Sequence, residues 1–180
     1  MKKYISIICL FAMASCVSLA TKKAEIKKQL MKPELMPKLS KGFVIQKLPN
    51  WQFHGFHNVL HYTPKELMDV GDEFIYNSIS ASNSDAKGRS LQSIVDNAVN
   101  KRMSHIEITN FKMFSEPTRY GESIIVTYDS KVRGKEYQTI KQYYKYKGRV
   151  YRVFYYARKE NFDKYSKDAI RMMKTFTITE

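Results

Sequence analysis

Hydrophobic and polar positions change their spacing several times along the chain, which predicts alternating kinds of secondary structure. After Gly42, alternation with a period of two and intervening turn residues predict strands at 43–47, 51–56, 74–82 and 106–114. The range 57–62 either continues the strand 51–56 or begins another after a bend at Gly55. Three further strand-like runs lie at 122–129, 136–146 and 149–157, and the Arg133-Gly134 and Lys147-Gly148 turns separate them. Connections this short predict antiparallel neighbours in one sheet.

Helical spacing of apolar residues occurs in two places. In the range 91–99 such residues recur every three or four positions after Ser90, a favourable N-cap. A second apolar stripe covers 162–176, with Asn161 as its expected cap, and residues 175–179 are expected to close an edge of the sheet. This order of elements predicts an α+β fold in which α-helices flank an antiparallel β-sheet.

Residues 1–20 have the features of an export signal. Lys2 and Lys3 precede a short apolar run and then a cluster of small residues. The run is shorter than the roughly 20 apolar residues that span a bilayer. Small residues lie directly before Cys16, as in a lipobox, so we expect cleavage before Cys16 and lipid attachment to its thiol. Cleavage after Ala20 is the alternative.

The site of cleavage decides the expected location. A chain acylated on Cys16 is expected to be an outer-membrane lipoprotein that faces the periplasm, whereas cleavage after Ala20 would give a soluble periplasmic or secreted protein. Residues 21–42 are rich in lysine and contain two prolines, which predicts a flexible basic tether. The range 43–180 then has the size of one globular domain.

Both cysteines of the chain lie within the first 20 residues, so the predicted domain contains none. Disulfides, thiol catalysis, iron–sulfur ligation and cysteine-based zinc sites are therefore excluded for the domain. The chain also lacks a Gly-x-Ser-x-Gly nucleophile elbow and a glycine-rich phosphate loop. We expect no catalytic residues, no cofactor and no small-molecule substrate.

Three histidines form the one pattern that suggests a metal. His54, His57 and His61 would share a face of a helix and could then hold zinc. The surrounding aromatic residues instead predict a strand, in which His54 points away from His57 and His61 because side chains alternate. We therefore expect no bound metal. A hydrolase or metal-dependent enzyme that uses this region is the alternative.

Positive charge is concentrated near the C-terminal end of a chain whose net charge is +14. The range 131–174 holds 14 Lys and Arg against 4 Asp and Glu, interleaved with tyrosines. A sheet face of this composition predicts a surface for an anionic partner, formed by Lys141, Lys145, Lys147, Arg149 and Arg152. Such strands can also bind single-stranded nucleic acid. An exported protein rarely meets nucleic acid, so we expect no such partner.

The order of these elements and several short stretches are familiar. They comprise the segment Phe43–Trp51, the middle amphipathic helix, the segment Lys147–Val153 at the end of the strand meander, and the closing segment Phe162–Ile178. Together they resemble the PsbP-like superfamily, which includes the Mog-type nuclear-import factor, bacterial lipoproteins and secretion chaperones. The resemblance implies an α/β/α sandwich around an antiparallel sheet and a non-enzymatic role in binding proteins or membranes.

We therefore expect an exported, lipid-anchored, non-catalytic binding or accessory protein of the cell envelope. Its partners would be the membrane, through the anchor, and an envelope protein whose identity the sequence leaves open. A basic adaptor that binds anionic lipid or polymer is a further alternative.

Overall fold

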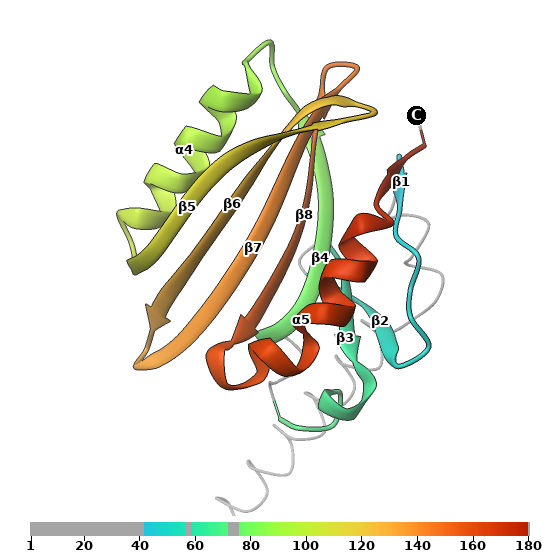
Figure 1. Ribbon diagram of the computed structural model, residues 1–180, viewed down its shortest axis with the longest axis vertical. Coiled ribbons are helices and arrows are strands. Elements are labelled where there is room, and N and C mark those ends of the chain that lie inside the picture. Colours follow the sequence, from blue (N-terminus) through green and yellow to red (C-terminus); the bar gives the residue numbers. More distant parts are fainter. Residues whose placement is uncertain (1–41, 57–58, 72–75, 180) are drawn as a thin grey trace, which may run out of the picture.

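A computed structural model describes residues 42–56, 59–71 and 76–179 of the chain (Figure 1). In this part, a seven-stranded antiparallel sheet has the strand order β2-β3-β4-β8-β7-β6-β5. Its strands are β2 (Trp51–Phe56), β3 (Val59–Pro64), β4 (Asn77–Asp85), β5 (Glu107–Thr118), β6 (Gly121–Val132), β7 (Lys135–Tyr146) and β8 (Arg149–Arg158). The remaining elements are β1 (Phe43–Val44), η1 (Lys65–Leu67), α4 (Leu91–Met103), α5 (Lys159–Lys174) and β9 (Thr177–Ile178).

The predicted α+β class, with helices on an antiparallel sheet, is confirmed. No helix in the described ranges is both long and apolar enough to cross a membrane. The predicted export signal, Cys16 and most of the tether lie outside the described residues.

Tight turns join the long strands β6, β7 and β8, as their sequence predicts. Arg133 and Gly134 have φ angles of 50° and 77°, and Lys147 and Gly148 have φ angles of 45° and 75°. Two successive positive φ angles are typical of the two-residue hairpin turns whose twist matches that of the strands. Strand β5 contains a bulge at Asn110, since its register against β6 shifts between Thr109 and Lys112.

Each face of the sheet has its own apolar core, and one helix covers each core (Figure 1). Val95 of α4 packs with Val126 and Val150 on one face, which we call the α4 face. Met172 of α5 packs with Tyr151 and other buried residues of β8 and β4 on the opposite face, the α5 face. Alternate residues of β7 and β8 therefore belong to different cores, as a period of two requires.

Helix α5 buries a stripe formed by Tyr165, Ala169, Met172 and Met173, which confirms the predicted amphipathic helix. The helix begins two residues before the expected cap, with Arg158 in the capping position, because β8 runs directly into it.

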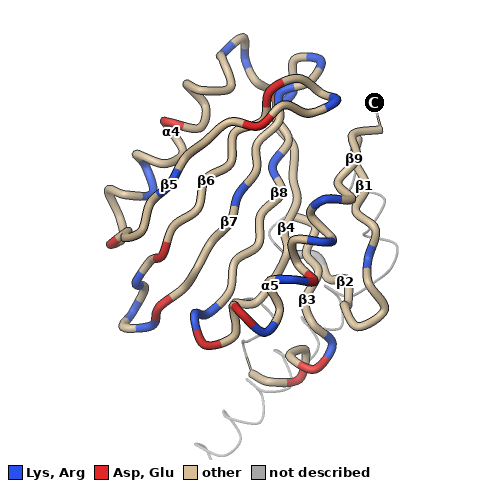
Figure 2. The backbone as a smooth tube through the Cα atoms, in the orientation of Figure 1, with Lys and Arg blue, Asp and Glu red and all other residues tan. Residues whose placement is uncertain are grey.

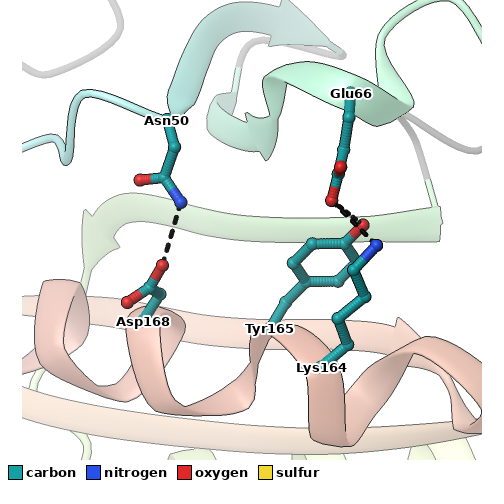
Figure 3. A network of polar contacts seen from close by, with 5 residues as sticks. All are labelled: Asn50, Glu66, Lys164, Tyr165 and Asp168. Carbon is teal, nitrogen blue, oxygen red and sulfur yellow. Dashed lines mark hydrogen bonds and ion pairs between the residues drawn. The ribbon is translucent and has the colours of Figure 1, made fainter.

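Polar contacts join α5 to Asn50 before β2 and to Glu66 in η1 after β3, at the β2–β3 side of the sheet (Figure 3). Glu66 accepts a hydrogen bond from the Tyr165 hydroxyl and pairs with Lys164 at 3.0 Å. One helical turn further on, the Asn50 amide donates to the Asp168 carboxylate at 3.0 Å. These contacts fix the direction of α5 across the sheet.

The sequence analysis expected the C-terminal tail to close an edge of the large sheet, and this expectation was wrong. Instead β9 pairs with β1, and Phe43 lies opposite Ile178. The Phe176 ring just before β9 is 4% exposed and stacks on Phe43 and Tyr144 with ring centroids 5.5 and 5.2 Å apart. Burial of this aromatic ring draws the tail over the α5 face and away from the sheet edge.

Candidate functional site

A groove of about 790 Å³ runs along the α5 face, between α5 and strand β5. An α-helix is about 10 Å wide, and strands lie about 4.8 Å apart, so one helix covers roughly two strands. Helix α5 packs on β8, β7 and β4. On this face, Figure 1 shows no described helix over β5 and β6. We call this concavity the α5 groove.

Strands β6 and β7 supply the floor of the α5 groove. Ile125 and Thr127 of β6 lie opposite Gln142 and Ile140 of β7, and all four side chains are half-buried. Their neighbours in the sequence, such as Val126, pack in the core of the α4 face instead. The floor is therefore a small area of sheet on which apolar and hydrogen-bonding side chains alternate.

The two long walls of the α5 groove carry exposed apolar side chains. Ile170 on α5 is 37% exposed, and Phe114 on β5 is 45% exposed. Glu116 and Thr118 continue the β5 wall. Large apolar groups on both sides of a concave surface are typical of a binding site.

Positive charge follows the α5 wall. Lys167, Arg171 and Lys174 lie at helical spacing on one side of α5, around Ile170. We call these three residues the cationic ridge. Figure 2 shows Lys and Arg positions along α5.

One end of the α5 groove is closed by groups that hold each other in place. Arg119 donates to the Thr177 hydroxyl at 2.7 Å, and its guanidinium lies 4.8 Å from the centre of the Tyr120 ring. The Tyr120 hydroxyl accepts a hydrogen bond from the Ile178 backbone N–H at 2.8 Å. Tyr144 lies below, where burial raises the pKa of its phenol. This end is rigid and positively charged.

The lining of the α5 groove combines apolar side chains with a few charged and hydroxyl groups. Its charged members are Glu116, Arg119 and Lys174, and its hydroxyl groups come from threonines and two tyrosines. Among the residues that the structure describes, no histidine, serine or cysteine lines it. Within the described ranges, no group of three His, Cys, Asp or Glu residues is placed to hold a metal ion.

The structure divides the five basic residues that the sequence predicts as one anionic-partner surface. Lys141, Lys145 and Arg152 lie on the α4 face. Each is two positions along its strand from Tyr143 or Val150, which pack in the core of that face, and side chains alternate between faces. Arg149 has the opposite parity, and its guanidinium donates to Asn83 on the α5 face. Lys147 lies in the β7–β8 turn.

The three residues that do share a face are half-buried. The Lys141 ammonium lies 5.6 Å from the centre of the Tyr128 ring and 5.4 Å from that of Phe154. Binding of an anion by Lys141, Lys145 and Arg152 stays a prediction.

The expected orientation of the histidines was wrong. The chain folds back after Phe56, so His54 and His61 are direct cross-strand partners on the same face. Their rings stack with centroids 5.1 Å apart. The His54 ring shares a hydrogen bond with Thr63 at 3.0 Å, and the His61 ring shares one with Ser80 at 2.7 Å.

The parity argument assumed one continuous strand, whereas a hairpin brings its two arms into register. Both rings are buried, and His57 lies outside the described residues.

Sequence reasoning missed the α5 groove. The spacing of Lys167, Ile170, Arg171 and Lys174 was a usable signal, because it places a basic stripe beside an exposed apolar residue on one helix. The floor could not be found in this way. Its members lie on β6 and β7, and they form an open surface only because α5, which packs on β8, β7 and β4, does not cover this part of the sheet.

No protein-family profile matches the chain, and neither does any curated protein sequence. Solved structures are similar. LpqN of Mycobacterium tuberculosis, described as involved in cell envelope biogenesis, has a TM-score of 0.58 at 11% identity, over 77% of this chain and 83% of that one. A Pseudomonas aeruginosa protein of unknown function has a TM-score of 0.53 at 8% identity, over 77% and 98% of the two chains.

A cyanobacterial PsbP from Synechocystis has a TM-score of 0.47 at 7% identity, over 77% of this chain and 82% of that one. Identities this low mean that all three likenesses concern the fold alone, and they carry no partner or activity with them. The chain shares its α+β fold with LpqN and the P. aeruginosa protein, and a PsbP is also among the similar solved structures.

Proposed function

We propose that this is an exported, non-catalytic binding protein of the cell envelope, anchored through a lipid on Cys16, and that it binds a protein partner in the α5 groove. The observation that carries the proposal is the groove itself. It has about 790 Å³ of space, exposed apolar groups on both walls and no set of side chains that resembles an acid–base pair or an activated nucleophile.

The envelope location is supported by the sequence. Residues 1–20 resemble an export signal with a lipobox at Cys16, and a lysine-rich segment follows. A lipid anchor with an adjacent basic tether gives two attractions to an anionic membrane surface. LpqN, which is similar in fold, is described as acting in cell envelope biogenesis, and this agrees with the proposed location.

Site-specific photo-cross-linking in living cells tests the binding site. A photoreactive phenylalanine analogue replaces Phe114 or Ile170, which are exposed on the two walls of the α5 groove. The matched control carries the analogue at Met103, which is 49% exposed at the end of α4. We expect discrete protein adducts in the envelope fraction from both groove positions and none from Met103. Adducts from Met103 alone, or from none of the three positions, would refute the assignment of the site.

Metabolic labelling tests the anchor separately. Labelled palmitate should enter the wild-type protein but not the Cys16→Ala variant, which should also lose its membrane association. A wild-type mature N-terminus at Thr21 would show instead that cleavage follows Ala20 and that the protein carries no lipid on Cys16.

A second candidate function, as an adaptor for anionic lipid or polymer, rests on the three basic residues that share the α4 face. Reversal of Lys141, Lys145 and Arg152 to glutamate should remove salt-sensitive retention on heparin or anionic vesicles. Retention equal to that of the wild type would exclude these residues as the anionic surface.

A further inference from the structure

We infer that the partner of the α5 groove is an extended, acidic segment of a protein, whose carboxylates face the cationic ridge and whose apolar side chains lie between Phe114 and Ile170. This inference rests on the proposed function, because it names the kind of partner that the same groove takes.

Charge is the first reason for an acidic partner. The cationic ridge and Arg119 place four positive groups beside the α5 groove, and within the described residues none of the four forms an ion pair. Glu116 is the one carboxylate in the lining. Positive groups that outnumber the carboxylates around a concave surface raise the local concentration of anionic ligands.

The apolar walls require that the partner also carries hydrophobic side chains. Phe114 and Ile170 remain exposed on opposite walls, and half-buried Ile125 and Ile140 form the floor between them. Successive side chains of an extended chain point to opposite sides. A segment with alternating acidic and apolar residues would therefore place its apolar groups on the floor and keep its carboxylates close to the rim.

Polar groups on the floor favour a peptide over an acyl chain. Thr127 and Gln142 lie among the apolar side chains of the floor, and Gln46 and Thr118 lie at its margins. Hydroxyl and amide groups can donate to and accept from a peptide backbone. The Gln142 amide already donates to Ser123 and the Thr118 hydroxyl to the Gly121 carbonyl, but amide and hydroxyl oxygens can accept further hydrogen bonds. A hydrocarbon chain would bury this remaining capacity unused, which costs free energy.

The edge of strand β5 is a less suitable place for the same segment. β5 ends the strand order of the large sheet, so its outer edge could in principle accept another strand. The bulge at Asn110 interrupts its register, and Pro117 lacks a backbone N–H. Both features blunt an edge, and the open groove beside it has neither.

Fluorescence anisotropy with a labelled decapeptide tests the inference. The probe alternates glutamate and leucine, and the matched control peptide alternates lysine and leucine. The full-length protein is used, in nanodiscs of neutral phosphatidylcholine when it carries a lipid. We expect the glutamate peptide to bind at least about tenfold more tightly than the lysine peptide, with an affinity that falls as salt is added.

Matched variants locate the binding. Arg171→Glu combined with Lys174→Glu should weaken binding of the glutamate peptide at least about tenfold. Lys65→Glu combined with Lys101→Glu makes the same change of charge at exposed positions outside the groove, and should change the affinity less than about threefold. Phe114→Ala should weaken binding about fivefold while the fold is retained, because its side chain is exposed. Urea unfolding of each variant checks the fold.

Several outcomes would overturn the inference. Equal binding of the two peptides, or equal losses in the two double variants, would show that the cationic ridge does not select an acidic segment. Displacement of the peptide by dodecanoate but not by an unlabelled copy of itself would point to an acyl ligand. Photo-adducts from the analogue at position 114 without binding of the glutamate peptide would refute the acidic segment as the partner and leave the proposed function standing. Peptide binding without photo-adducts in cells would show that the groove can bind an acidic segment but would refute the proposed function.

Discussion

Replacement of Phe176 by alanine is expected to destabilise the domain more than any exposed substitution in the α5 groove. The ring is 4% exposed and lies among three other aromatic rings. Its centroid is 5.5 Å from Phe43, 5.2 Å from Tyr144 and 6.4 Å from Tyr151. It therefore connects the β1–β9 pair, the floor strand β7 and strand β8 through a single side chain.

The magnitude follows from the burial. A Phe→Ala change in a core costs about 3 to 5 kcal/mol, from lost transfer free energy and the cavity left behind. Since Phe176 is almost fully buried and contacts rings on several sides, we expect about 4 kcal/mol. With a urea dependence of about 2 kcal/mol per molar, the unfolding midpoint should fall by about 2 M. Phe176→Leu keeps much of the volume and should cost about 1.5 kcal/mol.

Urea unfolding followed by tryptophan fluorescence measures this change. The chain has one tryptophan, Trp51, which is fully buried and lies edge-on to the Tyr165 ring, so its emission reports on the core of the α5 face. Ile170→Ala is the control, because Ile170 is 37% exposed and its loss should cost less than about 0.5 kcal/mol. A midpoint shift below about 0.5 M for Phe176→Ala would show that the ring does not connect these elements.

Three further changes have defined outcomes. Ser90→Ala removes the side chain that caps α4 and should cost about 1 kcal/mol in urea unfolding. The hydrogen bond from Tyr165 and the Lys164 ammonium lower the pKa of Glu66. Ionised Glu66 therefore stabilises the fold at pH values above its ordinary pKa. As the pH falls through the lowered pKa, the wild type should lose this stability in urea unfolding, whereas Glu66→Gln should not. Burial raises the pKa of Tyr62 and Tyr143 to about 12, so both phenols should stay neutral in the folded domain until the pH nears that value, which phenolate absorbance will show. Because tyrosines of the unfolded chain ionise near pH about 10, the stability of the domain should be complete below that pH and should fall as the pH rises through about 12.

Local patterns predict most of the elements because each one depends on its own residues. Side-chain alternation indicates the strands of the meander, and the spacing of Tyr165, Ala169, Met172 and Met173 indicates α5. Ser90 predicts the beginning of α4, and its hydroxyl accepts a hydrogen bond from the Ser93 N–H. The predicted strand 74–82 lies three residues later as β4, because β8 pairs with its polar second half as far as Asp85.

The errors concern pairing between segments, which no local pattern contains. His54 and His61 were assigned to opposite faces because their separation in the sequence is odd, yet a hairpin makes them opposite partners. The five basic residues were grouped by their closeness in the sequence, and strand parity then divided Arg149 from Arg152. The α5 groove has the same origin, since its floor and walls belong to different elements.

The pairing of β1 with β9 makes the domain a suitable object for circular permutation. Phe43 and Ile178 are antiparallel partners, so the two ends of the folded part lie about 5 Å apart at their Cα atoms. A linker of a few glycine and serine residues would join them. New ends opened at the Arg133-Gly134 turn would separate β6 from β7 in the chain while leaving both in the sheet. Such a permutant would place a fused reporter at the end of the β6–β7 hairpin, away from the residues that enclose Phe176.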